Sequence, residues 1–380
     1  MFKKNINNYY TFDRIKKYNA TYNIVIGKRS NGKTYSALME ILLNYTKYDK
    51  QSAYVRRMKT DFTAKTTSQL FASLVSNNEI AKASNGRWTD VYYRAGCWYL
   101  CTYVDEDEDK APKRVIDKTP FCYAFALSNM EHDKSVSYPN IDLVIFDEFL
   151  TRTFYLNDEF IIWCNVLSTI IRDRTDVRIF MLANTVSQDC PYFREMYLTE
   201  VIRQMQPNDI KLVESDEVKI AIEFTDSNTN IKSKETSKKY FNFKNPRLQM
   251  ISTGKWEIDC YPHKPVDYKP KDIVFKYFID YEIDKLMCDV VITDDCAFTY
   301  VYRKTGDIRE DDLVFTPRYD ARPNFIRRIT DTTNPIARKL YKFYVQEQFY
   351  YQDNEVGEIV RNYINWCKTC DNNKVMGGLI

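Results

Sequence analysis

The stretch TYNIVIGKRSNGKT, residues 21–34, decides how this chain folds. Its first half, residues 21–27, is rich in β-branched side chains and ends at a glycine, which predicts a short buried strand. Apolar side chains then recur at helical spacing over residues 33–47. The stretch therefore predicts a strand and a helix joined by a tight loop with a glycine at each end.

The loop itself, residues 27–34, matches the pattern G-x-x-x-x-G-K-[ST] of a P-loop. Such a loop wraps a phosphate with backbone N–H groups, and glycine removes the Cβ atoms that would collide. Lys33 is expected to reach the β- and γ-phosphates and Thr34 to ligate Mg²⁺. The pattern predicts a nucleoside triphosphate and Mg²⁺ as cofactors, bound by Gly27, Ser30, Asn31, Gly32, Lys33, Thr34 and Tyr35.

A second motif, DLVIFDE at residues 142–148, is a buried apolar strand that ends in two carboxylates. In the Walker B interpretation, Asp147 holds Mg²⁺ and Glu148 orients and deprotonates the attacking water. Acidic strand ends that only face solvent are common, so the motif alone decides little. Its occurrence together with a P-loop favours the functional interpretation.

A glutamate directly after the Walker B aspartate is typical of the additional-strand NTPases, in which an extra strand separates the two Walker strands. Predicted strands at 121–127 and 178–183 are the expected neighbours of the Walker B strand. Asn184, at the end of the latter, is a candidate sensor of the γ-phosphate or the attacking water. A strand-end asparagine that caps the following turn explains it equally well.

Strands and helices alternate over the first half of the chain, which predicts an α/β fold with a mainly parallel central sheet covered by helices. Its further predicted elements are strands at 52–57 and 142–147, a hairpin over 88–104 and a helix over about 157–172. We expect an ATPase domain over 1–200, a linker region over 201–265 and a smaller α/β domain over 266–380. Predicted helices near the end of the chain cover about 333–350 and 355–367.

Composition narrows the possible partners. The 380 residues carry 55 basic and 52 acidic side chains, a formal net charge of +3, so any nucleic-acid contact should be a local patch. No apolar run approaches the roughly 20 residues that span a bilayer, and the start MFKKNINNYY lacks a signal-peptide stretch. We therefore expect neither a membrane partner nor the secretory pathway.

Phosphoryl transfer also needs cationic help, which ring NTPases often take from a neighbouring subunit as an arginine finger. Arg172 and Arg174 end the predicted 157–172 helix, near the edge expected to hold the nucleotide. Basic side chains in a last helical turn also simply favour the helix dipole, so spacing alone leaves the assignment open.

The ordered set GKRSNGKT, YVRRMK, KSVSYPNIDLVIFDEFL, IIRDRTDVRIFMLANTVS and PYF resembles the DNA-packaging motor ATPases of phi29-type phages. The resemblance covers about residues 9–195. It implies that the trans-acting arginine falls on Arg172, with Arg174 as the neighbour that could be confused with it. It also implies that a trans-acting lysine falls on Lys134.

The resemblance further implies a terminase-like motor: a homo-oligomeric ring, expected to be a pentamer, at the portal of an empty capsid, where ATP hydrolysis drives double-stranded viral DNA inward. Such a protein would lie in the host cytoplasm and dock transiently on the procapsid vertex. The C-terminal domain would resemble a vestigial RNase H-like nuclease. Whether a structural RNA also takes part is left open.

The C-terminal region offers two charge patterns. Five aspartates, Asp280, Asp284, Asp289, Asp294 and Asp295, could be imagined as a two-metal nuclease cluster, but we interpret them as an acidic, mostly solvated surface. Residues 313–342 carry seven basic and two acidic side chains, a net of +5. Arg318, Arg322, Arg327 and Arg328 are the candidate nucleic-acid contacts, although an ordinary basic surface is as good an explanation for any one of them.

Two alternative functions follow from these patterns. A large terminase would combine the ATPase with DNA cleavage, which requires an intact C-terminal metal cluster. A nucleotide-gated, portal-binding scaffold would bind ATP without productive hydrolysis. DNA-stimulated release of phosphate separates the scaffold from a motor.

Overall fold

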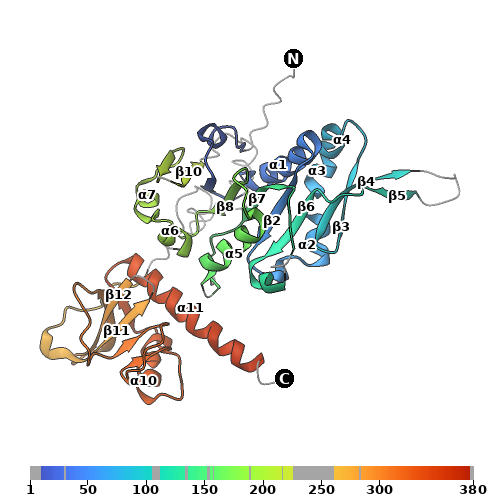
Figure 1. Ribbon diagram of the computed structural model, residues 1–380. Coiled ribbons are helices and arrows are strands. Elements are labelled where there is room, and N and C mark those ends of the chain that lie inside the picture. Colours follow the sequence, from blue (N-terminus) through green and yellow to red (C-terminus); the bar gives the residue numbers. More distant parts are fainter. Residues whose placement is uncertain are drawn as a thin grey trace, which may run out of the picture. The chain divides into compact units, whose positions relative to one another are not determined.

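The computed structural model describes residues 10–29, 31–104, 112–132, 136–151, 155–156, 158–187, 190–215, 217–225, 261–281 and 284–376. The chain forms two compact units (Figure 1). Unit 1 consists of residues 1–151 and 158–257, and unit 2 of residues 152–157 and 258–380. Each unit has its own sheet and its own buried core.

Unit 1 is built on a sheet of ten strands in its described part. Its path runs β3-β4-β6-β2-β7-β8-β1-β10-β9, and β5 pairs with β4. The strands are β1 (Tyr22–Gly27), β2 (Gln51–Arg56), β3 (Asp90–Arg94), β4 (Cys97–Val104), β5 (Lys113–Ile116), β6 (Cys122–Ala126), β7 (Ile141–Asp147), β8 (Arg178–Asn184), β9 (Ile210–Glu214) and β10 (Lys219–Thr225).

The middle of this sheet is parallel from β6 to β10, and antiparallel strands are added at both sides. The extra strand is confirmed: β8 lies between β7, which carries the second motif, and β1, which leads into the P-loop. The expectation for the strand at 121–127 was wrong. This strand, β6, pairs with β2 and not with β7, because residues 51–56 insert between them.

Helices cover both faces of the parallel strands, as expected. On one face, α1 (Lys33–Tyr48) buries Ala37, Leu38, Ile41 and Leu42 in the same cluster as Leu143 and Ile145 of β7. On the other face, Trp163 of α5 (Glu159–Ile171) packs against Phe146, with ring centroids 4.8 Å apart. Because alternate residues of a strand point to opposite faces, β7 is buried on both sides and reads as a continuous apolar run.

Shorter elements complete unit 1. The helices α2, α3 and α4 have weak amphipathic patterns and could not be recognised from periodicity. They and the remaining elements are α2 (Ala64–Gln69), α3 (Ala72–Ser76), α4 (Glu79–Ala83), α6 (Pro191–Glu195), α7 (Thr199–Gln204), and the 3₁₀ helices η1 (Ile15–Tyr18), η2 (Lys59–Asp61) and η3 (Leu127–His132).

The expected linker over residues 201–265 differs from the structure in its first part. Residues 210–214 and 219–225 form β9 and β10, and β10 pairs in parallel with the whole length of β1. The strand KIAIEFT is buried over nearly all of its residues. Its burial against the sheet makes it part of unit 1, although the polar stretch that follows it in sequence suggested a linker. The basic stretch 226–247 lies outside the described residues.

Unit 2 has a six-stranded sheet in the order β15-β14-β11-β12-β13-β16. β11, β12 and β13 are antiparallel, whereas the other neighbours pair in parallel. The elements are η4 (Pro270–Asp272), β11 (Ile273–Tyr281), β12 (Asp284–Ile292), β13 (Ala297–Arg303), β14 (Val314–Phe315), β15 (Phe325–Ile326), α10 (Pro335–Val345), β16 (Phe349–Tyr351) and α11 (Asn354–Met376).

The helix expected over 333–350 is shorter than predicted. It ends at Val345, and residues 349–351 return to the sheet as β16 beside β13. The α/β character of unit 2 is confirmed, while its likeness to an RNase H-like nuclease stays a prediction. Among the helices of the described ranges, none combines the length and the apolar character needed to cross a membrane.

Candidate nucleotide site

Sheet register brings the two sequence motifs to one edge. Gly27, the last residue of β1, lies opposite Asn184, the last residue of β8, and Asp147 of β7 lies opposite Leu182. The carboxyl ends of these parallel strands therefore meet, which is where open α/β sheets hold their ligands. The glycine loop, the acid pair and the candidate sensor come together by strand pairing alone.

Steric constraints explain why both ends of the loop carry glycine. A Cβ atom on Gly27 would come within 2.6 Å of the carbonyl oxygen of Thr225 in β10. Gly32 has a φ of 92°, a left-handed conformation that other residues rarely adopt. The first glycine thus lets β10 lie against the loop, and the second turns the chain into α1.

Lys33 is almost completely buried, and four oxygen atoms surround its Nζ. They are the carbonyls of Gly27 and Lys28, at 3.1 and 2.8 Å, and the side-chain oxygens of Asn31 and Asn184, at 3.1 and 3.3 Å. Burial lowers the pKa of Lys33 to about 7, and the nearby Asp147 carboxylate acts in the opposite direction. The expected phosphate-binding lysine is thus folded back onto its own loop.

Thr34 links the glycine loop to the acidic strand end. Its Oγ1 donates a hydrogen bond of 3.0 Å to Oδ2 of Asp147, although the two residues are 113 positions apart in the sequence. Oδ2 of Asp147 also accepts a 2.8 Å hydrogen bond from the hydroxyl of the fully buried Tyr54. Burial, and then the Asp147 carboxylate, raise the pKa of that hydroxyl, so Tyr54 stays a donor.

These groups fit a magnesium nucleotide. A hydroxyl and a carboxylate side by side are the ligand types that Mg²⁺ accepts from a protein. The Nδ2 of Asn31 is buried in the loop without a hydrogen-bond partner in the structure, as expected of a donor that awaits an acceptor.

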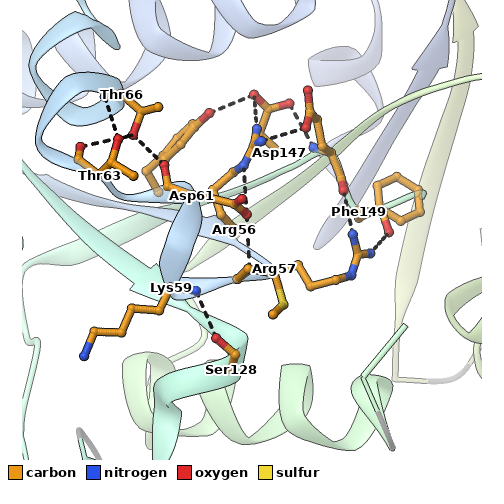
Figure 2. A network of polar contacts seen from close by, with 12 residues as sticks. Arg56, Arg57, Lys59, Asp61, Thr63, Thr66, Ser128, Asp147 and Phe149 are labelled. Atoms are coloured by element: carbon orange, nitrogen blue, oxygen red, sulfur yellow. Dashed lines mark hydrogen bonds and ion pairs between the residues drawn. The ribbon is translucent and has the colours of Figure 1, made fainter. Parts of the chain in front are cut away.

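Glu148 lies beside Asp147 in an unusual conformation. Its φ is 57°, and its side chain is 57% exposed. One carboxylate oxygen is 2.6 Å from a guanidinium nitrogen of Arg56. The other terminal nitrogen of Arg56 lies 3.7 Å from Oδ2 of Asp147; Arg56 and Asp147 are labelled in Figure 2. The expected base is thus held by an arginine of the neighbouring strand β2.

Sequence reasoning assigned no role to Arg56 or Tyr54. Both belong to the motif YVRR, which entered only as part of the family resemblance. The available signal was the position of this motif at the carboxyl end of a predicted strand. Such strand ends face the ligand edge of a parallel sheet, but strand order, which sequence does not show, decides which ones lie beside the acids.

Tyr35 and Ser30 differ from the rest of the expected nucleotide-binding set. The half-buried ring of Tyr35 packs against the core of unit 1, and its hydroxyl accepts a 3.3 Å bond from Asn77. Only its backbone remains a candidate for phosphate contact. Ser30 lies outside the described residues, as does Lys134.

Arg172 and Arg174 do not lie near the nucleotide edge, and that expectation was wrong. Arg174 donates to the carbonyl of Ile141, the first residue of β7, whereas Asp147 is the last. Seven strand residues span roughly 20 Å, so both arginines lie at the opposite edge of the sheet. The cause is that α5 runs antiparallel to β7 and ends where that strand begins.

The two arginines differ in how they are held. Arg174 is half-buried and donates to the backbone carbonyls of Pro139, Ile141 and Ile170 at 2.9, 2.5 and 2.9 Å. Arg172 is exposed, and its guanidinium bonds the carbonyl of Val136 at 2.9 Å. Arg174 therefore stabilises the chain before β7, while Arg172 presents its guanidinium at the surface.

The four candidate nucleic-acid arginines all lie in unit 2. Arg322 forms a two-point ion pair with Asp320, at 2.9 and 2.6 Å, and covers the ring of Phe325. Arg318 and Arg327 are exposed, and Arg328 is half-buried. The local charge available to a phosphate is therefore smaller than the residue count suggests.

The aspartates considered for a nuclease cluster are engaged separately. Asp284 pairs with Arg303 at 2.5 Å, Asp289 accepts hydrogen bonds from Tyr268 and Tyr302 at 3.0 and 3.2 Å, and Asp280 lies 4.0 Å from Arg318. In the described part of the chain, no three His, Cys, Asp or Glu side chains gather in a metal-binding group.

Known proteins similar to this chain are phage packaging proteins. Residues 103–241 match the family of the podovirus DNA encapsidation protein Gp16. The DNA packaging protein of Bacillus phage phi29 is 29% identical over 193 residues, which cover 49% of each chain, and that of Bacillus phage B103 is 29% identical over 179 residues. This chain thus spans about half the length of the curated relatives it matches.

Two solved structures share the fold over nearly the whole chain. The viral genome packaging motor assembly of bacteriophage Phi-29 has a TM-score of 0.55 at 22% identity and covers 93% of this chain and 96% of its own. The Phi-28 gp11 DNA packaging motor has a TM-score of 0.55 at 19% identity, with 95% and 98% covered. The resemblance indicated by the sequence motifs is confirmed: this chain is similar to the DNA packaging proteins of phi29-like phages and has the fold of their motors.

Proposed function

We propose that this chain is a Mg²⁺-dependent ATPase that drives double-stranded viral DNA into a preformed capsid. The observation that carries the proposal is the 3.0 Å contact between Thr34 of the glycine loop and Asp147 of the acidic strand end. This contact brings the P-loop and the Walker B motif together in one nucleotide site. The similarity to packaging proteins supplies the substrate, DNA, to which the hydrolysis is coupled.

Nucleotide binding uses groups that are engaged with each other in the structure. The backbone N–H groups of residues 28–34 and the N-terminus of α1 hold the phosphates. Lys33 exchanges the carbonyls of its own loop for phosphate oxygens, and Thr34 and Asp147 hold Mg²⁺. The metal, when bound, neutralises charge on the phosphates.

Hydrolysis requires Glu148 to leave Arg56. In the structure their ion pair, at 2.6 Å, occupies the carboxylate that orients and deprotonates the water. Arg56 also faces Asp147, so a change of charge at the metal site alters what this arginine pairs with. Asn184, bonded to Lys33 at 3.3 Å, is placed to follow the γ-phosphate together with that lysine.

The active unit is a ring of copies of this chain, by analogy with the motor assemblies that share its fold. Arg172 lies roughly 20 Å from Asp147 of its own chain, by the strand length between them. It can therefore serve as an arginine finger only for a neighbouring subunit. Lys134 is the proposed second trans-acting group, on the strength of the family resemblance.

The proposed partners are double-stranded DNA, further copies of the chain in a homo-oligomeric ring, expected to be a pentamer, and the portal of a procapsid in the host cytoplasm. A structural RNA is an additional partner to be tested. Within unit 2, Arg327 is a better candidate for phosphate contact than Arg322, whose charge Asp320 balances, or Arg318, which lies 4.0 Å from Asp280. If the protein contacts DNA phosphates and does not read the bases, its affinity for DNA should depend strongly on salt concentration.

Neither alternative function is favoured by a particular observation. DNA cleavage would need the C-terminal aspartates to converge on metal ions, and three of them have separate partners instead. A scaffold without hydrolysis has no need of Glu148 in a strained conformation next to the metal-binding acid.

The proposal predicts that phosphate release by the assembled protein is stimulated by double-stranded DNA and rises cooperatively with protein concentration. The reason is that each site is completed by a neighbouring subunit. The measurement is the rate of ATP hydrolysis over a range of protein concentrations, with and without DNA. A rate per subunit that is constant with concentration and indifferent to DNA would contradict it.

Nucleotide binding above neutral pH should take up a proton. With a pKa of about 7, Lys33 is mostly neutral in the free protein at about pH 8, and a bound triphosphate favours its charged form. Uptake should approach one proton at that pH and vanish at about pH 6, where the free lysine is already charged, so affinity falls as pH rises above 7. Calorimetry in buffers of different ionisation enthalpy measures this, and a binding heat independent of buffer at about pH 8 would refute it.

Arg172→Ala should lower hydrolysis by assembled rings by about 10³-fold or more, the usual effect of a lost arginine finger, while nucleotide binding persists. The decisive assay mixes Arg172→Ala with Glu148→Gln subunits, each inactive alone. Mixing places an intact Arg172 beside an intact Glu148, so activity should partly return. Exposed Arg94→Ala is the matched control, and mixed rings as inactive as their components would exclude a trans-acting Arg172.

A further inference from the structure

The turn that carries Glu148 is held by its surroundings rather than by its own preference. A left-handed φ of 57° is unfavourable for a residue with a side chain. The N–H of Glu148 donates to Oδ1 of Asp147 at 3.0 Å, and the N–H of Phe149 donates to the carbonyl of Leu182 in β8 at 3.2 Å. The backbone is thus fixed on its donor side by β7 and β8.

Arg57 holds the carbonyl groups of the same turn. One guanidinium nitrogen donates to the carbonyl of Phe149 at 2.5 Å, and the other lies 3.5 Å from the carbonyl of Glu148. Figure 2 shows this side chain reaching the backbone at Phe149, beside Asp147 and Arg56. Whereas Arg56 pairs with the carboxylate of Glu148, Arg57 contacts the backbone carbonyls of Glu148 and Phe149.

The guanidinium of Arg57 is in turn locked by a buried carboxylate. Its Nε lies 3.0 and 2.8 Å from the two oxygens of Glu159, the first residue of α5, which is 1% exposed. Tyr192 of α6 donates a 2.6 Å bond to the same carboxylate. Three elements, β2, α5 and α6, therefore determine where the donors of Arg57 point.

We infer that Arg57 is a positioning residue for Glu148: held by Glu159 and Tyr192, its guanidinium keeps the backbone of the Glu148 turn in the conformation that places the carboxylate beside Asp147. The inference rests on the proposed function, in which Glu148 acts on the attacking water. The side chain of Glu148 is 57% exposed, so packing does not orient it, and the proposed hydrolysis requires it to leave Arg56. Once that ion pair is broken, the backbone of the turn sets where the carboxylate lies. A buried ion pair is not needed for stability as such, since apolar residues often replace one without loss.

The inference predicts a loss of turnover without a loss of binding. Loosening the turn displaces the carboxylate by a fraction of an ångström or more, and misplacement of about 1 Å can cost on the order of 10²-fold in rate. Lys33 bonds the carbonyls of its own loop and Thr34 bonds Asp147. We therefore expect nucleotide affinity to stay nearly unchanged.

The test compares the full-length double variant Arg57→Gln/Glu159→Gln with the unmodified protein and with exposed Arg94→Gln. Changing both partners leaves no uncompensated buried charge, so the fold is retained while the clamp on the two carbonyls is lost. We expect its kcat to fall by about 10- to 100-fold, with affinity for a fluorescent ATP analogue and the thermal midpoint nearly unchanged. Unchanged kcat in a folded double variant would overturn the inference.

A Glu148→Gln background separates positioning from general damage. If Arg57 acts through Glu148, adding the Arg57→Gln/Glu159→Gln pair to Glu148→Gln should lower the residual rate no further; a second full decrease would overturn the inference. Should the double variant fail to fold, Tyr192→Phe removes one hydrogen bond of the same network and should show a smaller decrease with the same non-additivity. If Glu148→Gln itself hydrolyses ATP at the normal rate, the proposed function fails instead, which is a distinguishable result.

Discussion

The rest of the structure depends on the parallel pairing of three strands. Because β8 lies between β7 and β1, the ends of all three strands fall within two residues of one another, and Thr34 can bond Asp147 across 113 residues of sequence. The α1 helix, the buried Lys33 and the strained Glu148 all depend on that edge. A shift of one residue between β7 and β8 would turn every side chain of β7 to the other face and separate the two motifs.

The site holds its charges in pairs that a nucleotide would replace. Lys33 bonds the carbonyls of its own loop, Thr34 bonds Asp147, and Glu148 bonds Arg56. Each of these contacts engages a group that the proposed chemistry needs for phosphate, metal or water. Such an arrangement keeps the charged groups of the site paired without a ligand, while Nδ2 of Asn31 stays without an acceptor among the described residues. Binding then exchanges partners instead of desolvating bare charges.

Much of this site could be predicted from sequence, because both motifs are local. Residues 27–34 and 142–148 carry their own strand, glycine and carboxylate signals, so the edge of the sheet was recognisable without coordinates. What sequence could not supply is which strands are neighbours and in which direction a helix returns. For that reason Arg56, Tyr54 and Arg57 had no assigned roles, β6 was given the wrong neighbour, and Arg172 was expected at the wrong edge. The strand β10 was missed because its burial comes from β1, far away in sequence, and β9 is a largely exposed strand that pairs with β10.

The most direct measurement of the central claim is an experimental structure of the assembled protein with Mg²⁺ and a non-hydrolysable ATP analogue. The account predicts a metal ion within bonding distance of Thr34 Oγ1 and close to Asp147. Lys33 should have moved from its loop carbonyls to the terminal phosphates, and Glu148 should have separated from Arg56. A nucleotide bound elsewhere, or bound here with the contact of Lys33 to the carbonyl of Lys28 and the Arg56–Glu148 pair both intact, would contradict the account.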